Sequence, residues 1–214
     1  MTRGPAKVLA FIQARTTSTR LPNKIYKDLN GAPILFHTIA RAKEASRWVD
    51  DVIVLSPEPL PDLPTGTREF VASKVDEGDV LGRFAACIEA NPCDYVVRLT
   101  SDCPLLDPHL IEYVVAVGVL NNADYCSNVL DASFPDGVDV ELISAKVLTS
   151  LNESINSDHE REHVTAFLRR PEWRSHPSFN LVSIVNDEDL SKVKLSIDTE
   201  ADLERVRKLE GVRA

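Results

Sequence analysis

The chain has 214 residues, of which 43% are hydrophobic and 27% charged, and its net charge at pH 7 is −9. A chain of this length and composition can bury enough apolar surface to fold without disulfides or a structural metal. Its acidic balance argues against general binding of nucleic acids or anionic membranes, which attract basic surfaces.

The sequence carries no targeting signal that we can identify. Its first seven residues are too polar for a signal peptide, and no apolar run is long enough to cross a membrane. Four cysteines stand at positions 87, 93, 103 and 126, without the spacing of a zinc site. We therefore expect a cytoplasmic protein whose cysteines are free thiols.

Strand and helix patterns alternate along the first half of the chain. Apolar runs predict strands at 8–12, 52–55, 70–72 and 95–99. Amphipathic patterns predict helices at 34–45, 79–90 and 108–120, the last two with Asp79 and Asp107 as N-caps. Four prolines between positions 56 and 66 predict an irregular loop.

The second half is less regular. Strands are predicted at 124–129, 138–143, 181–185 and 193–197, and helices at 145–155, 160–169 and 199–209. Together these elements predict one α/β domain over residues 1–214, with three layers and a mostly parallel central sheet. The strands around 124–143 predict a small antiparallel insertion in that sheet.

The most informative segment follows the first predicted strand and runs from Ile12 to Lys24. It carries three cations, Arg15, Arg20 and Lys24, around four consecutive hydroxyl residues at 16–19. Loops after strands hold the ligands of open α/β sheets, and Arg and Lys suit the oxygens of a polyphosphate. The segment has no glycine, so it matches neither a Walker A nor a GxGxxG motif. A solvated loop is the alternative.

Two carboxylates, Asp102 and Asp198, each come directly after a predicted strand. Because parallel strands end at one edge of a sheet, these carboxylates can share a hard divalent cation that also binds phosphate oxygens. Each has a plainer interpretation as well. Asp198 can cap the helix that follows it, and Asp102 can cap a turn.

Three further segments carry weaker signals. Gly78 and Asp79 open a helix, and glycine allows close approach of a ligand to the backbone. Asp139 and Glu141 alternate on a predicted strand and therefore face the same side, which is either a pocket wall or solvent. His163 lies in a charged helical stretch, where a surface position is the plainer interpretation.

Seven segments together resemble one family, in that family's order. They are residues 12–24, 78–81, 97–105, 127–128, 134–141, 161–165 and 197–203. The chain resembles the cytidylyltransferases that activate acidic sugars, particularly the group named after a spore-coat polysaccharide biosynthesis protein. More distantly, it is similar to the synthetases of CMP-linked deoxy-octulosonate and of CMP-linked sialic acids.

The resemblance implies a Rossmann-like nucleotidyltransferase fold of the GT-A type and assigns roles to single residues. The nucleotide-binding residues would be Ala14, Arg15, Ser18, Arg20, Lys24, Gly78, Asp79 and Arg98. Asp102 and Asp198 would bind Mg²⁺. The acceptor would lie near Asp139, Glu141, Glu162 and His163. The catalytic residues would be Arg15, Lys24 and Asp102.

The resemblance also implies a homodimer, and an insertion around residues 124–170 that serves substrate binding or dimerisation. Three positions differ from the family's pattern. Thr17 and Asn23 stand where glycine is common, and Gly82 replaces an acidic residue.

The reaction implied is transfer of CMP from CTP to an acidic sugar or a related acceptor, with release of pyrophosphate. Cationic side chains and Mg²⁺ would stabilise the developing charge, and the sequence shows no compelling general base. Three alternatives stay open: a nucleotidyltransferase for another NTP, a GT-A-like glycosyltransferase that takes a finished nucleotide sugar, and an inactive nucleotide-binding subunit.

Overall fold

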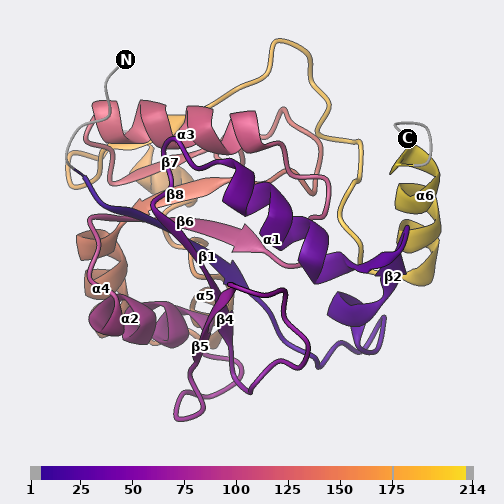
Figure 1. Ribbon diagram of the computed structural model, residues 1–214. Coiled ribbons are helices and arrows are strands. Elements are labelled where there is room, and N and C mark those ends of the chain that lie inside the picture. The colour runs from indigo at the N-terminus through magenta and orange to yellow at the C-terminus, as the bar shows by residue number, and fades with distance from the viewer. Residues whose placement is uncertain (1–5, 175, 211–214) are drawn as a thin grey trace.

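A central sheet of seven strands organises the computed structural model, which describes residues 6–174 and 176–210 (Figure 1). The strand order is β5-β4-β1-β6-β8-β7-β9. Four strands run parallel: β1 (Val8–Gln13), β4 (Asp51–Ser56), β5 (Arg68–Val71) and β6 (Tyr95–Thr100). Next to them, β8 (Glu141–Ser144) is antiparallel to both β6 and β7 (Tyr125–Ser127), and β9 (Leu181–Ser183) is parallel to β7. The predicted mostly parallel sheet with an antiparallel insertion is confirmed.

Helices cover both faces of the sheet and make the three predicted layers (Figure 1). One face carries α1 (Ile34–Glu44) and α3 (Pro108–Leu120). The opposite face carries α2 (Val80–Ala90), α4 (Ala145–Ser154) and α5 (Asp158–His163). The last helix, α6 (Glu200–Glu210), stands at the edge of the molecule.

Alternation along β1 explains why both faces are covered. Ala10 and Ile12 belong to the hydrophobic cluster under α1 and α3, whereas Leu9 and Phe11 belong to the cluster under α2 and α4. Successive strand residues point to opposite faces, so a strand that is apolar at every position needs a layer on each side. The rings of Phe11 and Phe84 meet edge-on, 5.6 Å apart, and join β1 to α2.

Between β1 and α1 the chain forms small elements that the sequence patterns did not predict. The 3-10 helix η1 (Lys24–Tyr26) is followed by a short hairpin of β2 (Asp28–Leu29) and β3 (Ala32–Pro33). Asn23 precedes η1 with a φ of +54°, in the left-handed region. Asn and Gly tolerate that region best, which accounts for Asn23 at a position where glycine is common.

Two predicted elements are wrong. Residues 193–197 form no strand; Lys194 makes only an isolated bridge with Asp136. The predicted helix 160–169 appears as α5, which ends at His163, because Val164 has φ +50° and ψ −60°. A β-branched residue at positive φ cannot continue a helix. Thr165 N donates to His163 O at 2.5 Å, which closes a γ-turn around Val164.

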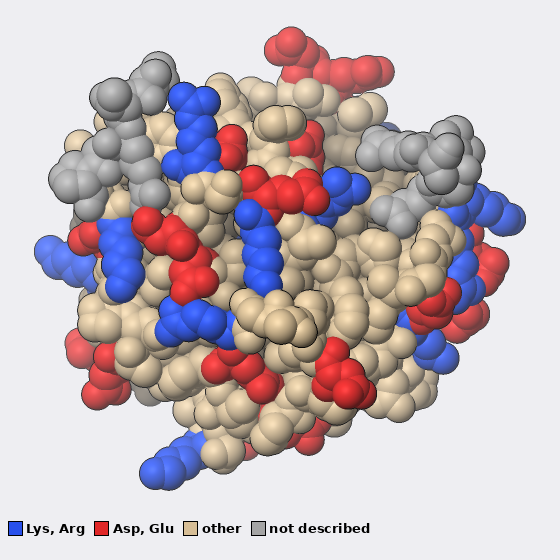
Figure 2. Space-filling view, viewed as in Figure 1, with Lys and Arg blue, Asp and Glu red and all other residues tan. Residues whose placement is uncertain are grey.

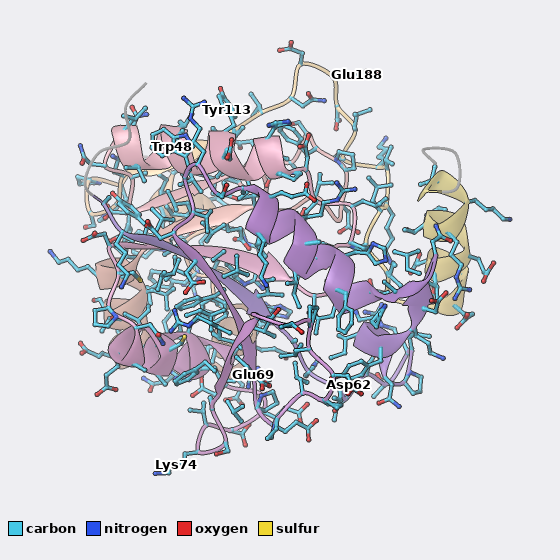
Figure 3. The ribbon with its side chains drawn as sticks, viewed as in Figure 1. Trp48, Asp62, Glu69, Lys74, Tyr113 and Glu188 are labelled. Carbon is cyan, nitrogen blue, oxygen red and sulfur yellow. The ribbon has the colours of Figure 1, made fainter. Side chains whose placement is uncertain are left out.

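The proline-rich segment 57–66 is an irregular loop, as predicted, and Glu69 on β5 anchors it (Figure 3). Ser56 Oγ and Leu60 N donate to the same carboxylate oxygen of Glu69, at 3.0 and 2.8 Å. Prolines have no N–H and cannot form such bonds, so the Glu69 carboxylate holds the loop through the donors that remain.

Among the described residues, no helix combines the length and the apolar character that crossing a membrane requires.

Segment 193–198 is held by the turn at Gly137 instead of by a strand pairing. Leu195 N and Ser196 N both donate to Asp136 O, at 2.6 and 3.0 Å. Gly137 has φ +107°, and a Cβ there would collide with the backbone of Leu195 and Ser196. The close approach of these two segments therefore requires glycine at 137.

Replacing Gly137 with Ala should destabilise the protein by about 2 kcal/mol or more, because strain at positive φ adds to a backbone collision. Urea unfolding would measure this loss. Gly66→Ala is the matched control, since Gly66 also has positive φ (+75°) but no atom within 4 Å of the added Cβ. Equal losses in the two variants would show that the collision carries no cost.

Candidate active site

A cleft opens at the carboxyl ends of β1 and β6, with a volume of about 260 Å³. Its walls come from the loop after β1, the loop after β6, the start of α2, the end of α5 and Asp198 in the segment before α6. The lining residues are Gln13, Ala14, Arg15, Thr17, Ser18, Thr19, Arg20, Lys24, Ile25, Val80, Arg83, Thr100, Ser101, Asp102, Glu162, His163 and Asp198. The cleft thus lies at the edge of the sheet where the sequence predicts ligand binding.

Lys24 stands at the centre of this cleft between the two strand-end carboxylates. Its Nζ lies 2.7 Å from Asp102 Oδ2 and 3.3 Å from Asp198 Oδ1. Arg20 reaches the same oxygen of Asp198, at 2.9 Å. Asp102 and Asp198 lie 78 and 174 positions after Lys24 in the sequence, and both contact its ammonium group.

Asp198 reaches the cleft without a preceding strand. Ile197 N donates to Asp102 O at 3.0 Å, which places Asp198 beside Asp102. The cap of α6 comes from its neighbours: Thr199 N donates to Asp202 Oδ2 at 3.0 Å, and Asp202 N donates to Thr199 Oγ1 at 3.2 Å. This reciprocal pair is a capping box, so the structure assigns helix capping to Thr199 and Asp202 rather than to Asp198.

Asp198 is held in its charged form. Burial by itself raises the pKa of this carboxyl, but hydrogen bonds from Lys194 and Lys24 and the charges of both lysines lower the pKa overall. Asp198 therefore presents a negative charge to the cleft.

Asp102 and Asp198 are the residues that would hold a magnesium ion. Both contact the same ammonium, so the two carboxylates lie near one another. Within the described ranges there is no group of three or more acidic, His or Cys side chains that could enclose a metal. Mg²⁺ is commonly held by one or two carboxylates, with substrate phosphates and water completing its shell, so two are sufficient.

Arg15 lies on the other wall of the cleft, near Glu77 and Glu162. Its guanidinium nitrogens are 3.8 Å from Glu77 Oε1 and 3.6 Å from Glu162 Oε1, and half of the side chain is exposed. The Thr17 hydroxyl also donates to Glu77. The residue that replaces the family's usual glycine thus ties the cationic loop to the loop before α2.

His163 and Glu162 line the cleft at the end of α5. The His163 ring contacts that of His159, with centroids 4.5 Å apart. Burial and the neighbouring His159 lower the pKa of His163, so its neutral form dominates at pH 7. The γ-turn at Val164 turns the chain away directly after these two residues.

Arg83 is a cleft residue that the sequence reasoning missed. Arg83 is 3% exposed, and its Nη1 donates to the carbonyl oxygens of Asp76 and Glu77 at 3.1 and 2.7 Å. Its Nε has no partner among the described residues, but that atom is enclosed by protein and does not itself face the cleft. The available signal was a charged residue on the apolar face of a helix, among Val80, Leu81, Phe84 and Cys87.

Asp79 and Gly78 are not among the residues that line the cleft. Asp79 caps α2 by accepting from Gly82 N at 2.8 Å, as predicted. Its two oxygens also take a bidentate pair from Arg161, both at 2.9 Å. A Cβ at position 82 would collide with the Asp79 carboxylate, which explains Gly82 in place of an acidic residue.

Arg98, Glu141 and Asp139 are also absent from the lining. Arg98 forms a buried ion pair with Glu141, and its Nε donates to Gln13 Oε1 at 3.0 Å. Glu141, itself 2% exposed, also accepts from the Tyr125 hydroxyl. Burial, with the charges of Glu141 and Asp136, raises the pKa of Asp139 to about 6. Arg98, held by Glu141, therefore fixes the side chain of the cleft residue Gln13. Asp139 lies near the carboxylates of Glu141 and Asp136.

The surface charge is mixed on the face seen in Figure 2, where basic and acidic side chains are interspersed without a broad basic area. A duplex or a membrane needs such an area, whereas the cations around Lys24 are confined to one cleft.

Comparisons with known proteins agree with this geometry. A family described as cytidylyltransferase matches residues 9–213. The spore coat polysaccharide biosynthesis protein SpsF of Bacillus subtilis is 30% identical over 94% of this chain and 85% of its own length. A 3-deoxy-manno-octulosonate cytidylyltransferase of a Bradyrhizobium strain is 31% identical over 73% of this chain and 58% of its own length.

Solved structures share the fold. A cytidylyltransferase from Leptospira borgpetersenii superposes with a TM-score of 0.86 and 28% identity, covering 97% of this chain and 87% of that one. A CMP:2-keto-3-deoxy-manno-octonic acid synthetase complexed with CTP gives a TM-score of 0.71 at 18% identity, covering 98% of this chain and all of that one. With the family matched over nearly the whole sequence, the chain belongs to the cytidylyltransferases and is an enzyme of the nucleotidyltransferase type.

Proposed function

We propose that this protein transfers CMP from CTP to an acidic sugar or a related acceptor, with Mg²⁺ and with release of pyrophosphate. The observation that carries the proposal is the Lys24 ammonium between Asp102 and Asp198, with Arg20 on the same carboxylate. This cluster combines cations for phosphate oxygens with carboxylates for the metal. A cytoplasmic location and a homodimer with the 124–170 insertion at substrate or subunit contacts complete the proposal.

The reaction is a displacement at the α-phosphorus of CTP. An acceptor oxygen forms the new P–O bond, the bond to the pyrophosphate oxygen breaks, and negative charge grows on the leaving group. Arg15, Arg20 and Lys24 would bind these oxygens and stabilise the charge in a partly dry cleft. Mg²⁺, bound by Asp102 and Asp198, would supply further positive charge when present. The acceptor's proton, where it has one, passes to solvent.

Arg83 supports the choice of cytosine, because it lines the cleft and its guanidinium can only donate hydrogen bonds. Cytosine N3 and O2 both accept hydrogen bonds, whereas uracil presents an N–H at position 3. A fixed donor there would pair with cytosine and meet a second donor in uracil, so it favours CTP over UTP.

The acceptor is assigned to the α5 side of the cleft. Glu162 and His163 line that side, and Arg15 lies between them and the loop before α2. An arginine beside an acceptor site suits a carboxylate or a phosphonate group, because its fork binds two oxygens at once. Relatives named for 3-deoxy-manno-octulosonate, an acidic sugar, support the same class.

CTP should stabilise the protein more than UTP, GTP or ATP, and Mg²⁺ should increase the effect. At 100 times its Kd, a ligand adds about 2.7 kcal/mol, which raises the Tm of a chain this size by roughly 5–10 °C. Thermal unfolding with each nucleotide, with and without Mg²⁺, measures this. A shift selective for another nucleotide would change the donor, and the absence of any shift would contradict an active nucleotidyltransferase.

Lys24→Ala and Arg15→Ala should each lower kcat by roughly 100- to 1000-fold, about 3–4 kcal/mol, by analogy with removal of one donor from an oxyanion site. Asp102→Asn should most weaken the dependence of turnover on Mg²⁺. Pyrophosphate release in the presence of an acidic sugar measures both. Lys74→Ala is the control, because Lys74 is exposed on a loop tip (Figure 3). Normal turnover in a cleft variant would remove that residue from the mechanism.

Arg83→Lys should reduce the preference for CTP over UTP by about tenfold or more, since one hydrogen bond from a charged donor contributes about 1.5–3 kcal/mol. Lysine keeps a positive charge but lacks the planar set of guanidinium donors. Calorimetric titration with both nucleotides gives the ratio of their Kd values. Equal losses for CTP and UTP would instead mean that Arg83 contacts a group the two nucleotides share.

A further inference from the structure

We infer that Lys194 is a positioning residue that fixes the orientation of Asp198 in the cleft, an inference that rests on the proposed function. Lys194 is not among the residues that line the cleft. Its Nζ lies 3.0 Å from Asp198 Oδ2 and 3.0 Å from Asp202 Oδ2. The ammonium therefore bridges the cleft carboxylate to a carboxylate in the first turn of α6.

The two oxygens of Asp198 have separate partners. Oδ1 faces the cleft, where Arg20 and Lys24 contact it at 2.9 and 3.3 Å. Oδ2 faces away and is held by Lys194. A carboxylate with one oxygen held in this way cannot rotate freely, so Asp198 offers the cleft a single oxygen in a fixed direction.

The anchor behind Lys194 is itself fixed. Asp202 has only 8% of its side chain exposed, and its oxygens accept from Asp198 N, from Thr199 N and from Arg205 Nη2 at 3.1, 3.0 and 2.8 Å. With these contacts, the position of the Asp202 carboxylate is fixed, and it holds the Lys194 ammonium at 3.0 Å.

The backbone of Lys194 is fixed as well. It pairs with Asp136 in an isolated bridge, and Arg205 Nε donates to Lys194 O at 3.1 Å. The backbone and the ammonium of Lys194 are thus both restrained. Removing the ammonium would free Asp198, and the backbone contacts would still hold the segment.

Charge and position predict opposite effects on metal binding. If Lys194 acted only through its charge, its removal would relieve repulsion and tighten binding of a divalent cation. If it positions Asp198, its removal should weaken binding, because groups that orient a metal ligand typically contribute 10- to 100-fold in affinity. The fixed Oδ2 contact favours the second effect.

The experiment compares Mn²⁺ binding to wild type, Lys194→Met and Lys192→Met by water proton relaxation, together with thermal unfolding of each. Lys192 is exposed and makes no ion pair within the described part of the chain, so its variant controls for lost charge nearby. We expect about tenfold weaker binding in Lys194→Met, no change in Lys192→Met, and partial recovery in Lys194→Arg.

Unchanged or tighter Mn²⁺ binding in a folded Lys194→Met variant would overturn the inference while leaving the proposed function intact. Should Lys194→Met fail to fold, Lys194→Arg decides: the planar guanidinium cannot occupy the same point between two carboxylates, so Mn²⁺ binding identical to wild type would also overturn it. If wild type binds no Mn²⁺, the proposed metal site fails and the inference fails with it.

Discussion

The cleft depends on one interaction, the ammonium of Lys24 shared by Asp102 and Asp198. Two carboxylates on neighbouring segments repel each other, and a cation between them lets the chain bring them together. Lys24 comes from the 3-10 helix after β1, Asp102 from the loop after β6, and Asp198 from the residues before α6. Three separate parts of the fold therefore meet at one charge, and the same contact fixes the end of the cationic loop after β1.

The first half of the fold could be predicted because its signals are local. Continuous apolar runs give buried parallel strands, and Asp79 and Asp107 cap their helices through hydrogen bonds within three residues. The prediction of a strand at 193–197 was wrong although the residues alternate as in a strand, because Leu195 N and Ser196 N donate to Asp136 O beside a glycine turn. This contact depends on the φ angle of Gly137, and the sequence pattern does not reveal that angle.

The site could be predicted where charge alone indicates function. Arg15, Arg20, Lys24, Asp102 and Asp198 all line one cleft. Prediction from pattern could not distinguish side chains that face the cleft from those that support it: Arg98 and Glu141 pair with each other beneath it. Nor could it find Arg83, which lies on the buried face of α2 and yet lines the cleft, or Lys194, which contacts Asp198 and Asp202.

The guanidinium of Arg161 links the two sides of the cleft mechanically. It donates to both carboxylate oxygens of Asp79, the N-cap of α2, and to the carbonyl oxygens of Asn152 and Ile155 at the end of α4. The next two residues, Glu162 and His163, line the same cleft as Arg83 on α2. The contact between Arg161 and Asp79 would pass a displacement of α2 to α5, and we expect two ligands that contact these helices to bind with coupled free energies.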